Sequence, residues 1–145
     1  MVSERQRMDE GKIIPSKPAK PAAIDTLRQC MSQWPERWKV DDSDVEIGRQ
    51  LTETLEPFLL DLIRQGLAAK TLARHRDYLE MLGGEIIRRC HDEPDLTKQP
   101  VGDLLLNLIE EDGGPLIWPR ITETTQRQLD ATCSKLYRFL QTHNQ

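Results

Sequence analysis

Apolar and aromatic side chains are scarce in this sequence of 145 residues, at 37% and 5% of the chain. No run approaches the roughly 18 consecutive apolar residues that a transmembrane helix needs, so we expect no contact with a membrane. The first residues lack the apolar segment of a secretory signal peptide. These absences favour a cytoplasmic protein with one modest domain, from which part of the chain is left out.

Cysteine and histidine are too few and too scattered for a disulfide framework or a zinc finger. The three cysteines, Cys30, Cys90 and Cys133, include no CxxC pair, which predicts free thiols in a reducing compartment. None of the three histidines lies at finger spacing from a cysteine pair. The adjacent Cys90 and His91 indicate a helix end rather than two ligands. We therefore expect no metal and no small-molecule cofactor.

The motifs of the common catalytic sites are also missing. There is no GxxxxGK[ST] or GxGxxG phosphate loop, no GxSxG elbow and no HExxH pair. Glu110 and Glu111 lie at an expected helix end, which indicates solvated charge rather than an acid–base pair. Cys133 falls on an apolar stripe and predicts a core thiol. His75 predicts a packed, hydrogen-bonded side chain rather than a catalytic base. We expect no enzyme activity.

Charge is unevenly distributed along the chain, whose net charge is −4. Residues 1–40 carry eight Lys/Arg and five Asp/Glu, whereas residues 41–145 carry twelve and nineteen. Most of the acidic excess lies in 92–123, with eight acids against two basic residues. The stretch 69–91 reverses the balance, with five basic residues and three acids. The whole chain therefore argues against strong nonspecific nucleic-acid binding, but one basic stretch stands out.

Two parts of the chain differ in pattern, an arm at 1–40 and a helical body at 41–142. Four prolines interrupt the arm and predict a flexible or loosely packed, partly polyproline-like segment, at Pro15, Pro18, Pro21 and Pro35. One short helix could span 22–31. Trp34 and Trp38 are four residues apart, and we expect them to pin the arm to the body. The alternative is that they form a partner-binding patch.

The body predicts an all-α fold, a compact bundle of four main helices. Apolar stripes at helical spacing place these helices at about 44–65, 69–89, 100–112 and 122–142. Pro57 predicts a kink or a restart near Glu56, and Gly66 predicts the end of the first helix. The Gly83-Gly84 pair predicts a bend or a close helix contact. Thr125 and Gln128 have the spacing of a capping box.

The stretch from Gly66 to Leu82 carries the most informative pattern. It runs from a glycine through a short turn to Thr71 and then to basic residues that face away from the apolar stripe. The last helix adds Thr124-Thr125 and Arg127 at its start and an aromatic-rich run at its end. This arrangement resembles the N-terminal core-binding domain of tyrosine recombinases, the phage-integrase family, over about residues 45–141. The resemblance implies a SAM-like helical fold.

The resemblance also implies which residues contact double-stranded DNA, because in that family this domain is half of a clamp around the duplex. The contacts would come from the starts of two helices, through Lys70, Thr71, Arg74, Thr124, Thr125 and Arg127. Helix N-termini, hydroxyls and basic side chains are common phosphate contacts. Taken without the resemblance, these residues fit an ordinary solvated amphipathic helix better than a DNA contact, because a few basic residues per helix are common.

The family's catalytic residues have no counterparts in this sequence. None of the three histidines is followed by Arg at the third position, and Tyr78 and Tyr137 lie inside helical patterns. We therefore expect a stand-alone, noncatalytic bacterial domain, encoded near a mobile element, that binds DNA alone or beside a full-length recombinase or a second copy. The acidic body would narrow its DNA footprint to one face.

A second interpretation makes the chain a helical protein-interaction adaptor. Such an adaptor would bind or regulate a recombinase, or another partner, without touching DNA. Its interface would be the acidic stretch 92–123, including Glu110 and Glu111, together with Trp34 and Trp38. The two interpretations differ in their response to charge reversal at Lys70 or Arg74, which an adaptor should tolerate.

Overall fold

The computed structural model describes residues 21–143, and this part of the chain is all-α, as the sequence predicts. It contains six α-helices and one 3-10 helix: α1 (Pro21–Met31), α2 (Trp34–Trp38), α3 (Asp44–Arg64), α4 (Ala69–Asp92), η1 (Pro94–Lys98), α5 (Val101–Leu108) and α6 (Glu123–His143). The only strand-like pairing within 21–143 is an isolated bridge between Glu110 and Gly113. None of the described helices has the length and apolar character to cross a membrane.

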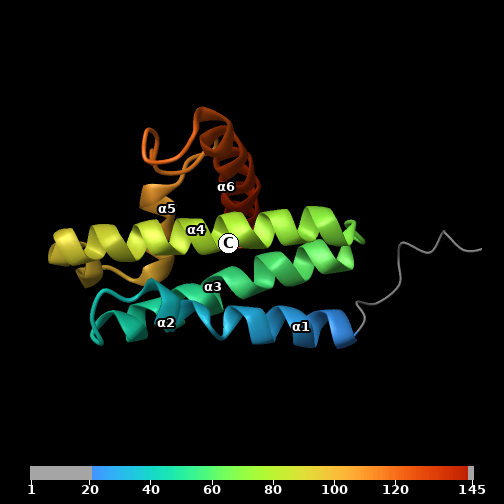
Figure 1. Ribbon diagram of the computed structural model, residues 1–145, viewed down its shortest axis with the longest axis horizontal. Helices are drawn as coiled ribbons and strands as arrows, with labels where there is room; N and C mark the ends of the chain where they lie inside the picture. The colour runs from blue at the N-terminus through green and yellow to red at the C-terminus, as the bar shows by residue number, and fades with distance from the viewer. Residues whose placement is uncertain (1–20, 144–145) are drawn as a thin grey trace, which may run out of the picture.

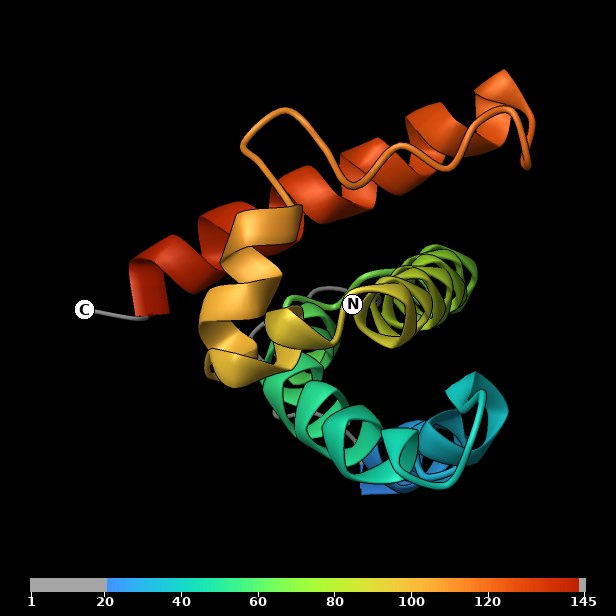
Figure 2. The same ribbon diagram turned by 90° about the vertical axis from the view of Figure 1, so that its left-hand side faces the viewer.

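Helices α3 and α4 lie antiparallel at the centre of the molecule (Figure 1). The short helices α1 and α2 cover one side of α3, and α6 lies across α4 on the other side (Figure 2). The core between these layers is mainly leucine and isoleucine, with Leu51, Leu55, Leu79, Leu82 and Leu129 fully buried. The long segment 109–122 returns along α6, where side chains of α6 hold its backbone.

Helix α3 is continuous from Asp44 to Arg64 through Pro57. The expected restart near Glu56 is therefore wrong. Pro57 removes one backbone donor, but it is exposed, and buried apolar side chains on the adjacent turns hold the helix together. Gly66 follows the helix end with φ of +78°, a left-handed conformation that glycine adopts without strain. This confirms its predicted role.

Helix α5 ends at Leu108, before the acidic trio that the sequence placed in its last turn. Glu110 and Gly113 instead exchange backbone hydrogen bonds of 2.7 and 3.1 Å across a tight turn. Carboxylates at a helix C-terminus are disfavoured by the helix dipole, so an early end is the favourable outcome. The acidic residues are left exposed on this turn.

The predicted boundary between an arm and a body at residue 41 is wrong. Helices α1 and α2 pack against α3, and Leu27, Met31, Trp34 and Trp38 are buried in the common core. Burying two indoles removes enough apolar area from water to order this segment despite its prolines. The folded unit therefore includes the chain from Pro21 onward. Residues 1–20, with the prolines at 15 and 18, lie outside the described residues.

Trp38 fixes α2 to the middle of α4. Its indole Nε1 donates a 2.8 Å hydrogen bond to the carbonyl of Glu80, and its ring lies directly on Gly83. A Cβ at Gly83 would be 2.1 Å from Cζ2 of the indole. The close contact predicted from Gly83-Gly84 is thus confirmed. Trp34 and Trp38 are 0% and 7% exposed, so the alternative of a partner-binding patch at these two residues is wrong.

Candidate nucleic-acid interface

Two hydrogen bonds fasten α4 to α6 where the helices cross. His75 Nδ1 lies 2.8 Å from the hydroxyl of Thr132, and both side chains are buried. One turn further along α4, the hydroxyl of Tyr78 donates to the amide oxygen of Gln128. The predicted structural role of His75 is confirmed. These contacts set the face of α4 against the first turns of α6.

A cleft of about 500 Å³ opens beside this crossing and brings together three of the six residues predicted to contact DNA. Lys70 and Arg74 contribute from α4, and Thr125 contributes from α6. The remaining lining residues are Ala73, Asp77, Tyr78 and Met81. Residues 55 positions apart in the chain therefore form one surface. Thr71 is half-buried at the start of α4 and does not line the cleft.

The basic residues of the cleft are available to a ligand. Lys70 and Arg74 are exposed, and neither forms an ion pair with any residue in 21–143. Asp77 in the same cleft lies 3.4 Å from Arg76. Between residues 62 and 76 the sequence holds four basic residues and no acid. With Lys70 and Arg74 against Asp77, the lining of the cleft carries a net positive charge.

The start of α4 adds free backbone donors to these side chains. Ala68 at the N-cap position makes no side-chain capping hydrogen bond, and the first turn contains no acid. The first turns of α3, α5 and α6, by contrast, each contain an acidic residue. The first N–H groups of a helix lack partners within the helix, so those of α4 can bind an anion.

Thr124 and Arg127 do not join this cleft. Arg127 lines a separate cleft of about 530 Å³ with Glu111, Asp112 and Asp130, and it lies 3.9 Å from Glu123. Thr124 is exposed and lines neither cleft. The structure therefore does not bring these two residues together with Lys70 and Arg74, and their contact with DNA stays a prediction.

Capping of α6 also differs from the sequence-based expectation. The side chain of Thr122 accepts a 3.1 Å hydrogen bond from the backbone N–H of Thr125 and donates to the Thr125 hydroxyl. The capping residue is thus Thr122, three residues before the expected one. The same contact fixes the Thr125 side chain at the edge of the cleft.

The positive potential near the cleft acts on His75. Burial lowers the pKa of this imidazole below its usual 6.5, and the nearby charges of Lys135 and Arg74 lower it further. The neutral form is therefore favoured in the folded protein. An unfolded chain takes up the proton at a higher pH than the folded one, so protonation favours unfolding.

We predict that the free energy of unfolding decreases as the pH falls from above 6.5 through the lowered pKa of His75. Urea denaturation of the wild type and of His75→Asn at about pH 7.5 and pH 5 measures this effect. The variant cannot titrate, so it should lose this part of the pH dependence. His143→Gln, which changes an exposed histidine of α6, should keep it. Equal pH dependence in wild type and His75→Asn would contradict the prediction.

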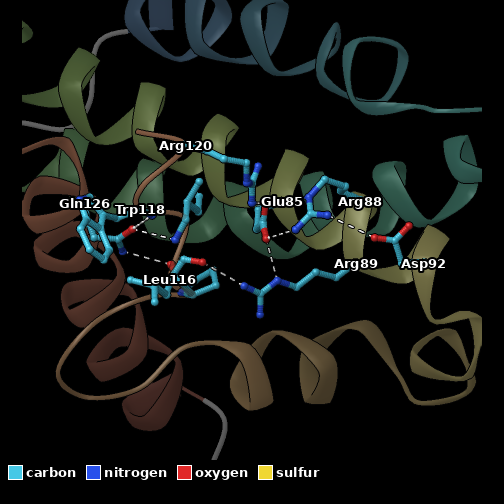
Figure 3. A network of polar contacts seen from close by, with 10 residues as sticks. Glu85, Arg88, Arg89, Asp92, Leu116, Trp118, Arg120 and Gln126 are labelled. Atoms are coloured by element: carbon cyan, nitrogen blue, oxygen red, sulfur yellow. Dashed lines mark hydrogen bonds and ion pairs between the residues drawn. The ribbon is translucent and has the colours of Figure 1, made fainter. Parts of the chain in front are cut away.

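The far part of α4 holds a buried carboxylate among three arginines (Figure 3). The side chain of Glu85 is 3% exposed, with ion pairs of 2.8 Å to Arg88, 2.7 Å to Arg89 and 2.9 Å to Arg120. Burial would raise the pKa of Glu85, but hydrogen bonds from Arg88, Arg120 and Arg89 outweigh it and lower the pKa to about 2. These arginines are committed to the fold, although the sequence analysis counted two of them in the basic stretch 69–91.

Gln126 of α6 fixes the segment that carries Arg120 (Figure 3). Its amide oxygen accepts hydrogen bonds from the backbone N–H of Ile117 at 2.8 Å and of Trp118 at 3.0 Å. Its amide nitrogen donates to the carbonyl of Pro115 at 3.1 Å. The segment therefore has a defined path, which exposes Leu116 and Trp118.

An acidic cleft of about 660 Å³ lies beneath this segment. Glu110, Glu111 and Asp112 line it together with Leu116 and Tyr137. The three acids are exposed, and none of them forms an ion pair with a residue in 21–143. The predicted acidic surface thus combines unneutralised charge with apolar contact area.

The cysteines are free thiols, as the sequence predicts. Cys133 is fully buried on α6, and burial, followed by the charge of Asp130, raises its pKa to about 12. Burial also raises the pKa of Cys90, with a further contribution from Asp44. A thiol with a raised pKa is a poor nucleophile, which fits the core role predicted for Cys133.

The cleft between α4 and α6 offers charge and hydrogen-bond donors to an anionic ligand. Lys70 and Arg74 supply the charge, and Thr125 supplies a hydroxyl. No reactive pair of nucleophile and base lines this cleft. Comparisons of the chain with protein families, with curated proteins and with solved structures found no match.

Proposed function

We propose that this protein is a noncatalytic DNA-binding domain that holds the phosphate backbone of a duplex in the cleft between α4 and α6. The observation that carries the proposal is the convergence of Lys70, Arg74 and Thr125 on one cleft beside an uncapped helix start. The resemblance to the core-binding domain of tyrosine recombinases supports the same surface. A role at a recombination site, alone or beside a recombinase, rests on that resemblance alone.

The chemistry of the cleft suits phosphate better than base recognition. Lys70 and Arg74 are one helical turn apart on an exposed face, so both can reach the same stretch of backbone. Phosphate contacts position a protein on DNA, whereas sequence is read by contacts to base edges. With few side chains directed outward from the cleft, we expect modest affinity and limited sequence preference.

The acids of the turn after α5 do not line the proposed DNA site, because they line two other clefts. Helix α4 has 24 residues and is therefore about 36 Å long. The Debye length at physiological ionic strength is about 8 Å. Repulsion from the acids of η1, which follows the far end of α4, is thus largely screened at the start of α4.

Fluorescence anisotropy of a labelled duplex, titrated with the protein at increasing salt, tests the proposal. Two phosphate contacts by basic side chains, those of Lys70 and Arg74, predict a slope of log K against log salt of about −1.8, or roughly twelvefold weaker binding at 200 mM than at 50 mM salt. Arg74→Glu and Lys70→Glu should each weaken binding by tenfold or more and make the slope shallower by about one.

Lys98→Glu is the matched control for these charge reversals. Lys98 is 79% exposed on η1, where it pairs with Asp95 at 3.1 Å, so the net charge changes equally but at the acidic end. This variant should bind DNA within about twofold of the wild type, since its site is several Debye lengths away. Equal losses in Lys98→Glu and Arg74→Glu would show that net charge, and not the cleft, controls binding.

A second function, the protein-interaction adaptor, is favoured by the acidic cleft. Glu110, Glu111 and Asp112 surround apolar area from Leu116 and Tyr137, a combination that suits a basic partner with an apolar anchor. Trp34 and Trp38 are not part of this interface because they are buried. The adaptor is favoured over the DNA-binding domain if folded protein shows no salt-dependent DNA binding.

A further inference from the structure

A cluster of potential metal ligands lies away from the three clefts described above, where the connection between α2 and α3 meets the end of α4. Asp41, Asp44 and His91 each place one donor atom within 4.8 Å of the donor atoms of the other two. Asp41 and Asp44 are 50 and 47 residues from His91 in the chain. Figure 1 shows the two segments at the same end of the molecule. No spacing motif in the sequence indicates this arrangement.

Asp44 is a buried carboxylate without a compensating cation. It is 8% exposed, and its Oδ2 accepts hydrogen bonds from the backbone N–H groups of Val40 at 2.8 Å and Asp41 at 3.0 Å. Its other oxygen has no hydrogen-bond donor among residues 21–143 but is reached by solvent, and the carboxylate has no Lys or Arg partner there. A role in starting α3 accounts for Oδ2 only. A buried negative charge is costly unless it is paired or coordinates a metal.

The two carboxylate oxygens of Asp41 have different neighbours. Oδ1 accepts hydrogen bonds from the backbone N–H and the hydroxyl of Ser43, whereas Oδ2 lies 3.9 Å from Nδ1 of His91. One oxygen of Asp41 is thus fixed by Ser43 while the other lies toward His91. Hydrogen bonds that orient ligating side chains are typical of metal sites.

The donor set selects a class of ion. Two carboxylates and one imidazole are typical of Zn²⁺ and neighbouring divalent transition metals, whereas Mg²⁺ and Ca²⁺ take oxygen ligands almost exclusively. Ligands of tetrahedral Zn²⁺ lie about 3.4 Å apart, given bond lengths of about 2.0–2.1 Å. The 3.9 Å between Asp41 and His91 requires only a small closure. Asp41 and His91 are exposed and can adjust their side chains.

We propose that Asp41, Asp44 and His91 form a binding site for a zinc-like divalent transition metal, with solvent completing its coordination. The bound ion neutralises the buried carboxylate of Asp44 and joins the α2–α3 connection to the end of α4. None of these three metal ligands lines the cleft between α4 and α6. The ion therefore stabilises the fold and takes no part in DNA binding. The sequence-based expectation of no metal site considered only ligands close together in the chain.

Titration of the tag-free, metal-free protein with Zn²⁺ and Co²⁺ tests this proposal. We expect one ion per chain, a visible Co²⁺ absorption band, and a Tm that rises by roughly 5–10 °C at a hundredfold excess of Zn²⁺ over its Kd. Millimolar Mg²⁺ should neither raise the Tm nor displace Co²⁺. A Zn²⁺ titration that does not end at one ion per chain would overturn the proposal. So would an equal rise in Tm with Mg²⁺.

Matched variants assign the ligands. Asp41→Asn keeps the acceptor for Ser43 and should weaken Zn²⁺ binding at least tenfold, as should His91→Gln. Asp42→Asn changes the neighbouring acid, which is 95% exposed, and His143→Gln changes an exposed histidine of α6; both should bind like the wild type. Equal weakening by the controls overturns the proposal. So does a thiolate-to-cobalt charge-transfer band, since it places the ion on a cysteine.

Discussion

Replacing Gly83 with alanine should lower the free energy of unfolding by about 3 kcal/mol, although alanine is the better helix former. The new Cβ would lie 2.1 Å from Cζ2 and 2.4 Å from Cη2 of Trp38, so the indole has to move. The indole is a rigid ring in the core, and its Nε1 is bonded to the carbonyl of Glu80. Moving it costs packing and a hydrogen bond that the gain in helix propensity, about 1 kcal/mol, does not offset.

Gly84→Ala is the matched control for this substitution. A Cβ at Gly84 would lie 3.4 Å from Cδ1 of Trp38, an ordinary contact. This variant should be neutral or more stable by up to about 1 kcal/mol. Urea denaturation followed by circular dichroism measures both variants, and Trp38→Leu should reduce the cost of Gly83→Ala. Equal stability of the two alanine variants would show that Trp38 does not pack as described.

Glu85→Gln should lower the free energy of unfolding by about 2–3 kcal/mol at neutral pH. The substitution keeps the shape of the side chain but leaves three guanidinium groups without their shared carboxylate. This loss of stability is smaller than for a fully buried ion pair. The arginine side chains are 30–54% exposed, so water can hydrate them once the carboxylate is gone. The substitution also removes the ion pair between Glu85 and Arg120, which holds the segment 109–122 against α4.

The pH dependence of this loss provides a second test. The pKa of Glu85 is lowered from 4.5 to about 2, so its ionised form stabilises the fold above pH 4.5. That stabilisation disappears as the pH falls from 4.5 toward 2, and the difference between wild type and Glu85→Gln should shrink with it. Glu80→Gln, which breaks one partly exposed pair with Arg37, should cost no more than about 1 kcal/mol. A cost for Glu80→Gln as large as that for Glu85→Gln would contradict this account.

The four long helical patterns were predictable because each carries an apolar stripe that its neighbours bury. The helices after Asp44, Ala69, Pro100 and Thr122 all appear where periodicity placed them. The helix ends were less predictable where charged residues follow the apolar stripe. Helix α5 stops at Leu108, before the three acids that the stripe alone would place in its last turn. The tryptophans that the sequence analysis expected to pin the arm are indeed buried, but the area they bury makes α1 and α2 part of the core and not a loosely packed arm.

Part of the candidate DNA-binding surface was also accessible to sequence reasoning. Lys70 and Arg74 share one exposed helical face and could be paired from spacing alone. Their proximity to Thr125 depends on how α6 crosses α4, which Tyr78 and Gln128 help to fix, and no local pattern encodes that crossing. The pairing of Arg88 and Arg89 with Glu85 has i,i+3 and i,i+4 spacing and was accessible from the sequence, whereas the contribution of Arg120 to the same carboxylate was not.

The most direct test of the proposed interface is a ¹⁵N NMR titration of the protein with a short DNA duplex at low salt. The proposed binding mode predicts that amide signals of residues 69–78 and 122–128 shift, that signals of 92–112 do not, and that the shifts disappear as salt is raised. Shifts that cluster at 106–116, or a folded protein whose spectrum does not change at low salt, would contradict it.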